Sequence, residues 1–195
     1  MVAPLEQSFV VVTWEDIENL SLKLFSLLKQ SFLPDIIVGV ARGGWIIARL
    51  LSDYLEIPNI TSIKVEFYKG IREHSSEPLI TQPLTVQVKD LKVLIVDDVA
   101  DSGSSLLKAK QHVQHKGAKV VKTATLHLKP WSKIKPDYYA EVVSGWVIYP
   151  WEVKETMKNL LKNWRGEGLS RDQILSRLVN MGLRRHVVDK LLEEF

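Results

Sequence analysis

The chain has 195 residues, of which 46% are hydrophobic and 25% are charged. This balance is ordinary for a globular protein and excludes a wholly disordered chain, which would lack the apolar surface to offset its ordering entropy. Domains run to roughly 100–200 residues, so we expect one main domain with a small appendage. The apolar runs are far shorter than the roughly 20 residues of a membrane span, and the first residues show no secretory signal pattern.

The chain contains no cysteine, which excludes disulfides and thiolate metal sites and fits a reducing cytoplasm. The net charge of +3 is unevenly placed. Residues 1–153 hold 17 basic and 17 acidic side chains, whereas residues 154–195 hold 9 basic and 6 acidic ones. A neutral main part argues against a broad nucleic-acid-binding face, but the basic tail leaves that function open.

The first half of the chain alternates strand and helix patterns. Residues 9–13 are expected to form a strand, and Thr13 with Asp16 forms an acidic variant of the capping box that starts a helix ending near Gln30. The apolar run 36–41 predicts a strand buried on both faces, and a helix is expected to follow over residues 44–55.

The alternation continues through the second half. Strands are expected over residues 59–67, 93–96, 119–128 and 146–149, with a helix over residues 106–116. Apolar strands that alternate with helices predict an α/β fold with a doubly wound parallel sheet. Ligands of such sheets bind at the carboxyl ends of the strands, so the chemistry is sought there.

Two segments depart from this pattern. Residues 69–82 are polar and without a clear period. A loop of this length is usually either disordered or a functional lid, and we favour the lid. Residues after 152 predict about three helices, with Ser170 and Gln173 as a capping box and Gly182 as a helix stop. We therefore expect a main domain with a hood over residues 1–153 and a small helical domain over residues 154–195.

The most informative segment is residues 93–106, VLIVDDVADSGSSL. An apolar strand runs into Asp97 and Asp98, and residues 101–105 then open a helix. Backbone N–H groups at a helix N-terminus bind anions, Gly103 permits close approach of a phosphate, and Ser102, Ser104 and Ser105 add hydroxyl donors. A phosphorylated sugar meets both demands, since the carboxylates accept bonds from sugar hydroxyls or bind Mg²⁺.

This segment resembles the phosphoribosyl diphosphate (PRPP) signature of type I phosphoribosyltransferases. All positions of the signature fit, with serine in place of the commoner threonine at both hydroxyl sites. The resemblance implies that residues 101–105 bind the 5′-phosphate and that Asp97 and Asp98 hold the ribose and, through Asp98, Mg²⁺. It also implies that Asp101 is the general acid/base facing the purine N7.

Other landmarks follow in family order. The string Ala41-Arg42-Gly43-Gly44 resembles the diphosphate-binding loop, and residues 69–82 occupy the place of the mobile lid, with Tyr68, Lys69 and Arg72 as candidate contacts. Lys129 occupies the position that donates to the base O6 in 6-oxopurine enzymes. The string GWVIYPWE over residues 145–152 resembles the xanthine-guanine type and its archaeal relatives, which implies purine contacts from Trp146, Val147 and Glu152.

The resemblance implies a purine phosphoribosyltransferase of purine salvage that uses PRPP, Mg²⁺ and a free purine, releases diphosphate and a purine nucleoside monophosphate, and acts as a cytoplasmic homodimer. Lys129 favours hypoxanthine, guanine or xanthine. Adenine stays open as an alternative, because backbone atoms around Trp146 and Val147 could also recognise it if the Lys129 side chain moves away. A second alternative is a PRPP-sensing regulator that binds nucleic acid through the tail. His112 and His115, three residues apart in the helix expected after the signature, could form a metal site only with a third ligand, and none is evident in the sequence.

Overall fold

The computed structural model describes residues 8–68, 77–164 and 166–195. These residues form two compact units. One unit consists of residues 17–143, and the other combines the N-terminal segment up to Asp16 with residues 144–195. Helix α1 (Trp14–Ser31) begins in the second of these units and continues in the first.

The unit of residues 17–143 is built on a six-stranded sheet with the order β4-β3-β2-β5-β6-β7. The neighbouring strands are parallel except β3 and β4, which pair antiparallel. The strands are β2 (Ile36–Ala41), β3 (Ile60–Tyr68), β4 (Glu77–Gln82), β5 (Lys92–Ala100), β6 (Val120–Leu128) and β7 (Tyr138–Val142). The predicted α/β fold with a mostly parallel sheet is confirmed.

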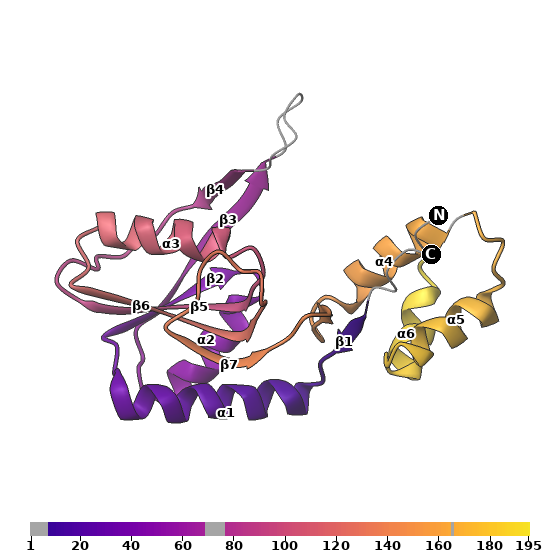
Figure 1. The fold of residues 1–195 in the computed structure, drawn as a ribbon, viewed down its shortest axis with the longest axis horizontal. Coiled ribbons are helices and arrows are strands. Elements are labelled where there is room, and N and C mark those ends of the chain that lie inside the picture. The colour runs from indigo at the N-terminus through magenta and orange to yellow at the C-terminus, as the bar shows by residue number, and fades with distance from the viewer. Residues whose placement is uncertain (1–7, 69–76, 165) are drawn as a thin grey trace. The chain divides into compact units, whose positions relative to one another are not determined.

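Helices cover both faces of this sheet (Figure 1). Helix α3 (Ser104–His115) lies on one face, and α1 and α2 (Gly44–Tyr54) lie on the other. Consecutive residues of the central strands, such as Ile37 with Val38 and Leu94 with Ile95, are therefore all fully buried. This two-sided burial explains why β2 and β5 read as continuous apolar runs rather than as alternating ones.

The two edge strands are the elements that the sequence patterns miss. Residues 77–82 are expected in a lid loop but form β4, which pairs with β3 at the edge of the sheet. The lid candidates Lys69 and Arg72 lie outside the described residues, and Tyr68 is the last residue of β3. Strand β7 lies at the opposite edge, where only Ala140 is buried, so it carries little apolar signal.

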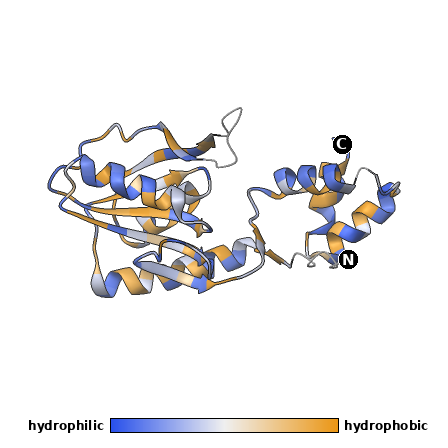
Figure 2. Ribbon diagram, turned by 45° about the horizontal axis from the view of Figure 1, so that its top comes forward, coloured by the Kyte–Doolittle hydropathy of each residue, from blue (hydrophilic) through white to orange (hydrophobic). Residues whose placement is uncertain are grey.

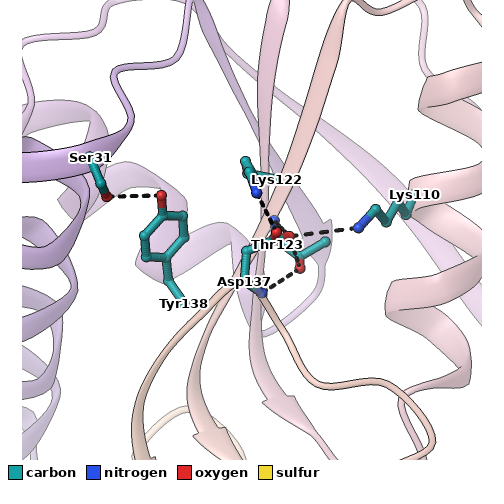
Figure 3. A network of polar contacts seen from close by, with 6 residues as sticks. All are labelled: Ser31, Lys110, Lys122, Thr123, Asp137 and Tyr138. Carbon is teal, nitrogen blue, oxygen red and sulfur yellow. Dashed lines mark hydrogen bonds and ion pairs between the residues drawn. The ribbon is translucent and has the colours of Figure 1, made fainter.

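A polar network ties β6 to the start of β7 (Figure 3). The carboxylate of Asp137 accepts hydrogen bonds from the backbone N–H and the hydroxyl of Thr123, both at 2.9 Å, and from Nζ of Lys122 at 2.8 Å. Burial alone would raise the pKa of Asp137, but these hydrogen bonds and the charge of Lys110 bring it below its ordinary value. The network lies toward the amino ends of both strands, away from the edge where ligands bind in such sheets.

The second unit has a two-stranded parallel sheet and the tail helices. Strand β1 (Phe9–Val11) pairs with β8 (Trp146–Ile148), and α4 (Val153–Trp164), α5 (Arg171–Asn180) and α6 (Arg185–Leu192) follow. Each helix carries both hydrophobic and hydrophilic residues (Figure 2). Their apolar residues form one core with Ile148, Phe9 and Val11.

Local signals in this part of the chain are confirmed. Thr13 and Asp16 exchange hydrogen bonds at the start of α1, and Ser170 and Gln173 form a reciprocal capping box at the start of α5. Gly182 follows α5 with a φ of +101°. The compact units divide between residues 143 and 144. Strand β8 belongs to the unit of the tail because Ile148 packs in the core of the tail helices. The domain boundary expected after residue 153 stays a prediction. No helix in the described ranges is long and apolar enough to span a membrane.

Candidate functional site

The carboxyl ends of β2, β5 and β6 bring three loops to one edge of the sheet. The register pairs Gly39 of β2 with Val96 of β5, and Ala100 of β5 with Leu128 of β6. Strand β5 is longer than the apolar run predicts and continues through Asp97 and Asp98. The parallel register therefore places this acid pair between the loop after β2 and the loop after β6.

Asp97 is a buried carboxyl at this edge, with only 9% of its surface exposed. Its Oδ1 accepts from the N–H of Asp98 at 3.0 Å, and Oδ1 of Asp98 accepts from the N–H of Val99 at 2.8 Å. Burial and then the neighbouring charge of Asp98 raise the pKa of Asp97 well above its ordinary value. A bound hydroxyl donor or cation would stabilise such a pair, because either one offsets the free-energy cost of burying negative charge.

The loop that joins β2 to α2 lies against these carboxylates. A Cβ atom on Gly43 would overlap Oδ2 of Asp98, and one on Gly44 would lie 2.8 Å from Cα of Asp97. The peptide bond between Ala41 and Arg42 is cis. A cavity of about 530 Å³ is lined by this loop, by the acid pair and by Lys64, Glu66 and Ser105. It combines the cations Arg42 and Lys64 with three carboxylates, of which Glu66 is ion-paired with Lys64. Cations beside the Asp97–Asp98 pair suit a phosphorylated ligand accompanied by a metal ion.

A second cavity, of about 410 Å³, lies over the loop that opens α3. It is lined by Asp101, Ser102, Gly103 and Ser105, and it shares Asp97 and Asp98 with the first cavity. Gly103 is the N-cap residue of α3, has a φ of +76° and offers no side chain to cap the helix. The N-terminus of α3 therefore lines the cavity, and its dipole favours a bound anion. One of its backbone donors, the N–H of Ser104, donates to Oγ of Ser102 at 3.3 Å.

The loop after β6 lies beside the loop that opens α3, since the N–H of Lys133 donates to the carbonyl oxygen of Ser102 at 3.1 Å. Nζ of Lys129 lies 5.5 Å from the ring centroid of Trp131, and Nε1 of Trp131 donates to Oδ1 of Asp101 at 2.8 Å. Lys129 is 5% exposed, and burial lowers its pKa, while the charge of Asp101 acts in the opposite direction. The structure thus brings Lys129 and Asp101 to one site, joined by a residue that the sequence reading passed over.

The sequence patterns do not predict Lys64 and Glu66, which line the first cavity, or Phe67, which lines the second. They also do not predict Trp131, which contacts Asp101. Trp131 follows Pro130 in a loop without a period, so no pattern marks it. Lys64 and Glu66 alternate with buried Ile63 and Val65 on β3, and they form an ion pair at 2.8 Å. The alternation could have placed both on one face of β3 near its carboxyl end.

The other predicted purine contacts belong to the second compact unit. Trp146 begins β8 and is 50% exposed, whereas Val147 is buried. Oε1 of Glu152 accepts from the N–H of Tyr149 at 3.2 Å, so this carboxylate stabilises the turn before α4. The roles expected for Trp146, Val147 and Glu152 in binding a purine stay predictions.

The carboxylates of the site suit Mg²⁺ only together with ligands from a substrate. Within the described residues no group of three or more His, Cys, Asp or Glu side chains could hold a metal ion. Mg²⁺ is usually bound by one or two carboxylates together with substrate phosphates and water, so the Asp97–Asp98 pair beside an anion site fits it. The histidine pair considered as a metal site, His112 and His115, has other hydrogen-bond partners. Nε2 of His112 accepts from the backbone nitrogen of Leu84 at 3.4 Å, and Nδ1 of His115 lies 2.7 Å from the carbonyl oxygen of Gln111.

The chain is similar to known proteins in both sequence and fold. The sequence profile of the family described as "Phosphoribosyl transferase domain" matches residues 13–156. The xanthine-guanine phosphoribosyltransferase of Gluconobacter oxydans is 31% identical over 147 residues, which cover 74% of this chain and 84% of that protein.

Solved structures with a similar fold include two purine phosphoribosyltransferases. The purine phosphoribosyltransferase from Pyrococcus horikoshii Ot3 is 39% identical with a TM-score of 0.68, over 74% of this chain and 93% of that one. The xanthine-guanine-hypoxanthine phosphoribosyltransferase of Helicobacter pylori is 27% identical with a TM-score of 0.67, over 79% and 99% of the two chains.

Proposed function

This chain belongs to the phosphoribosyltransferase family, and on that premise we propose that it transfers the phosphoribosyl group of PRPP to a 6-oxopurine. The products are diphosphate and a purine nucleoside 5′-monophosphate. The observation that carries the proposal is the acid pair Asp97–Asp98 near the end of β5, which is followed after a short loop by the N-terminus of α3. A sugar that bears both hydroxyls and a 5′-phosphate fits those two neighbouring features.

In the proposed reaction the bond from C1′ to the diphosphate oxygen breaks, and the bond from C1′ to the purine N9 forms. Residues 101–105 hold the 5′-phosphate and anchor the sugar, which supplies binding energy remote from the reacting atoms. Asp97 and Asp98 accept bonds from the ribose hydroxyls. Arg42 and the backbone of residues 41–44 hold the diphosphate as negative charge develops on it.

Asp101 is proposed to accept the proton of N7 as N9 attacks, so that the bound base reacts without gaining positive charge. Mg²⁺, which the resemblance implies and the carboxylate pair suits, would neutralise part of the diphosphate charge when bound. We extend the proposal to Tyr68, Lys69 and Arg72 as contacts of a lid that excludes water from the reacting sugar.

A 6-oxopurine is proposed as the base because Lys129 is a buried cation beside Asp101. A buried ammonium donates well to a carbonyl O6 but meets the amino group of adenine donor to donor, which leaves a polar group unpaired. The similar proteins named above are also named for xanthine, guanine and hypoxanthine. The homodimer and the cytoplasmic location implied by the resemblance belong to the same proposal.

The proposal is tested by the release of diphosphate from PRPP and Mg²⁺ with hypoxanthine, guanine, xanthine or adenine, each supplied alone. We expect base-dependent release with at least one 6-oxopurine and a much smaller kcat/KM with adenine. A preference for adenine would overturn the choice of base. Binding of PRPP without release of diphosphate with any base would overturn the enzymatic proposal.

A further inference from the structure

The loop of residues 129–134, which follows β6, lies against the loop that opens α3. The N–H of Lys133 donates to the carbonyl oxygen of Ser102 at 3.1 Å. A Cβ atom on Gly103 would lie 2.8 Å from Oγ of Ser132 and would overlap the side chain of Ile134. These contacts fix the backbone of the 129–134 loop against the anion site.

Trp131 is the residue of this loop that reaches the side chains of the site. Its Nε1–H donates to one oxygen of Asp101, and the ammonium of Lys129 lies near the face of its ring. Trp131 is 57% exposed, so burial of apolar surface does not account for the position of its ring. Its two polar contacts do, because one edge of the ring meets a carboxylate and the face meets a cation.

We propose that Trp131 is a positioning residue, which holds Asp101 and Lys129 in fixed relation for proton transfer at the purine. The inference rests on the proposed function, since it assigns to Trp131 the orientation of that reaction's acid/base. A carboxylate that accepts one hydrogen bond from a fixed donor keeps its second oxygen, Oδ2, in one direction. The attraction between the ammonium of Lys129 and the indole face likewise favours one placement of this side chain.

The variant Trp131→Phe removes the N–H donor and keeps an aromatic ring. We expect kcat with a 6-oxopurine to fall roughly tenfold, as loss of one hydrogen bond to a charged group implies, with KM for PRPP changed less than about twofold. Trp164→Phe is the matched control, because Trp164 in α4 also carries a cation on its ring, with Arg177 at 4.5 Å. It should leave kcat unchanged.

A double-mutant cycle separates positioning from a merely structural effect. If Trp131 acts through Asp101, then Trp131→Phe in an Asp101→Asn background should lower the residual kcat by less than about twofold. A full additional loss in that background would overturn the proposal. A Trp131→Phe variant with the same kcat as the parent would also overturn the role of Trp131. That result would not affect the proposed function.

A second measurement does not need turnover. The indole N–H resonance of Trp131, identified by its absence in Trp131→Phe, should move in Asp101→Asn and stay in place in Asp172→Asn, a change in α5. An unmoved resonance in Asp101→Asn would overturn the proposal. A parent chain that turns over no base would overturn this inference together with the proposed function, which distinguishes that outcome from the failure of Trp131 alone.

Discussion

Gly43 lies so close to Asp98 that a Cβ atom on the glycine would overlap Oδ2 of the carboxylate and approach Cγ to 2.5 Å. The loop after β2 and the acid pair of β5 are therefore in direct contact, although 55 residues separate them in the chain. Because of this contact, two motifs that are far apart in the sequence line one cavity. A side chain at position 43 would have to displace either the loop or the carboxylate.

The first prediction concerns Gly43→Ala. Displacement of reacting groups by about 1 Å costs on the order of a hundredfold in rate, so we expect kcat/KM for PRPP to fall about that much. The control is Gly166→Ala, since a Cβ atom there would meet nothing within 4 Å. Steady-state kinetics with a saturating base make the comparison, and a parental kcat/KM in Gly43→Ala would contradict the account.

The second prediction concerns the acid/base role of Asp101. General acid–base catalysis contributes about 10²–10⁴-fold, so Asp101→Ala should lower kcat by at least about a hundredfold. The affinity for PRPP should change far less, because the backbone of the anion site stays in place. Turnover gives kcat, and calorimetric titration gives the affinity for PRPP. Equal turnover in variant and parent would refute the assignment.

The third prediction concerns the choice of base. Lys129→Ala removes the buried donor, and we expect kcat/KM with hypoxanthine to fall about a hundredfold while kcat/KM with adenine does not fall. Lys133→Ala, a nearby exposed lysine in the same loop, is the control. The same loss with every base would mean that Lys129 supports the site in general and does not read O6.

The fourth prediction follows from the raised pKa of Asp97. A carboxyl whose pKa is higher in the folded than in the unfolded state favours folding at low pH, and this contribution is lost as pH rises through the folded value. Asp97→Asn keeps the acceptor oxygen and removes the titration. Its free energy of unfolding without ligand should therefore exceed that of the parent at pH 8 and converge with it near pH 3, as denaturant unfolding would show. A gap that widens toward low pH would contradict the burial argument.

The fifth prediction separates stability from function. Asp137→Ala leaves the N–H and hydroxyl of Thr123 and the amino group of Lys122 without their shared acceptor (Figure 3). We expect the free energy of unfolding to fall by about 3 kcal/mol, with kcat nearly unchanged well below the melting temperature. Asp53→Ala, which removes an exposed ion pair with Arg49, should cost less than about 1 kcal/mol. Similar losses in both variants would contradict the network's contribution.

The sequence predicts the buried centre of the sheet well and its edges poorly. Helices cover both faces of β2 and β5, so nearly every residue of these strands is apolar. Such an unbroken apolar run can be recognised locally in the sequence. Strand β4 pairs with a neighbour on one side only and keeps exposed residues, so its residues read as a loop. The pairing of β1 with β8 joins segments 137 residues apart in register, which no local pattern encodes.

The same distinction applies to the site. Asp97, Asp98 and residues 101–105 could be found because they are contiguous and follow an apolar strand. The bond from Trp131 to Asp101 could not, since it depends on how two loops pack after β5 and β6 are aligned. The contact between Gly43 and Asp98 likewise follows from strand register and not from either motif alone.

The central claim is tested most directly by one competition. The protein is incubated with PRPP, Mg²⁺ and equal concentrations of hypoxanthine and adenine, and the nucleotides formed are separated and weighed by mass spectrometry. The account predicts inosine monophosphate in large excess over adenosine monophosphate. Adenosine monophosphate as the main product, or no nucleotide at all, would contradict it.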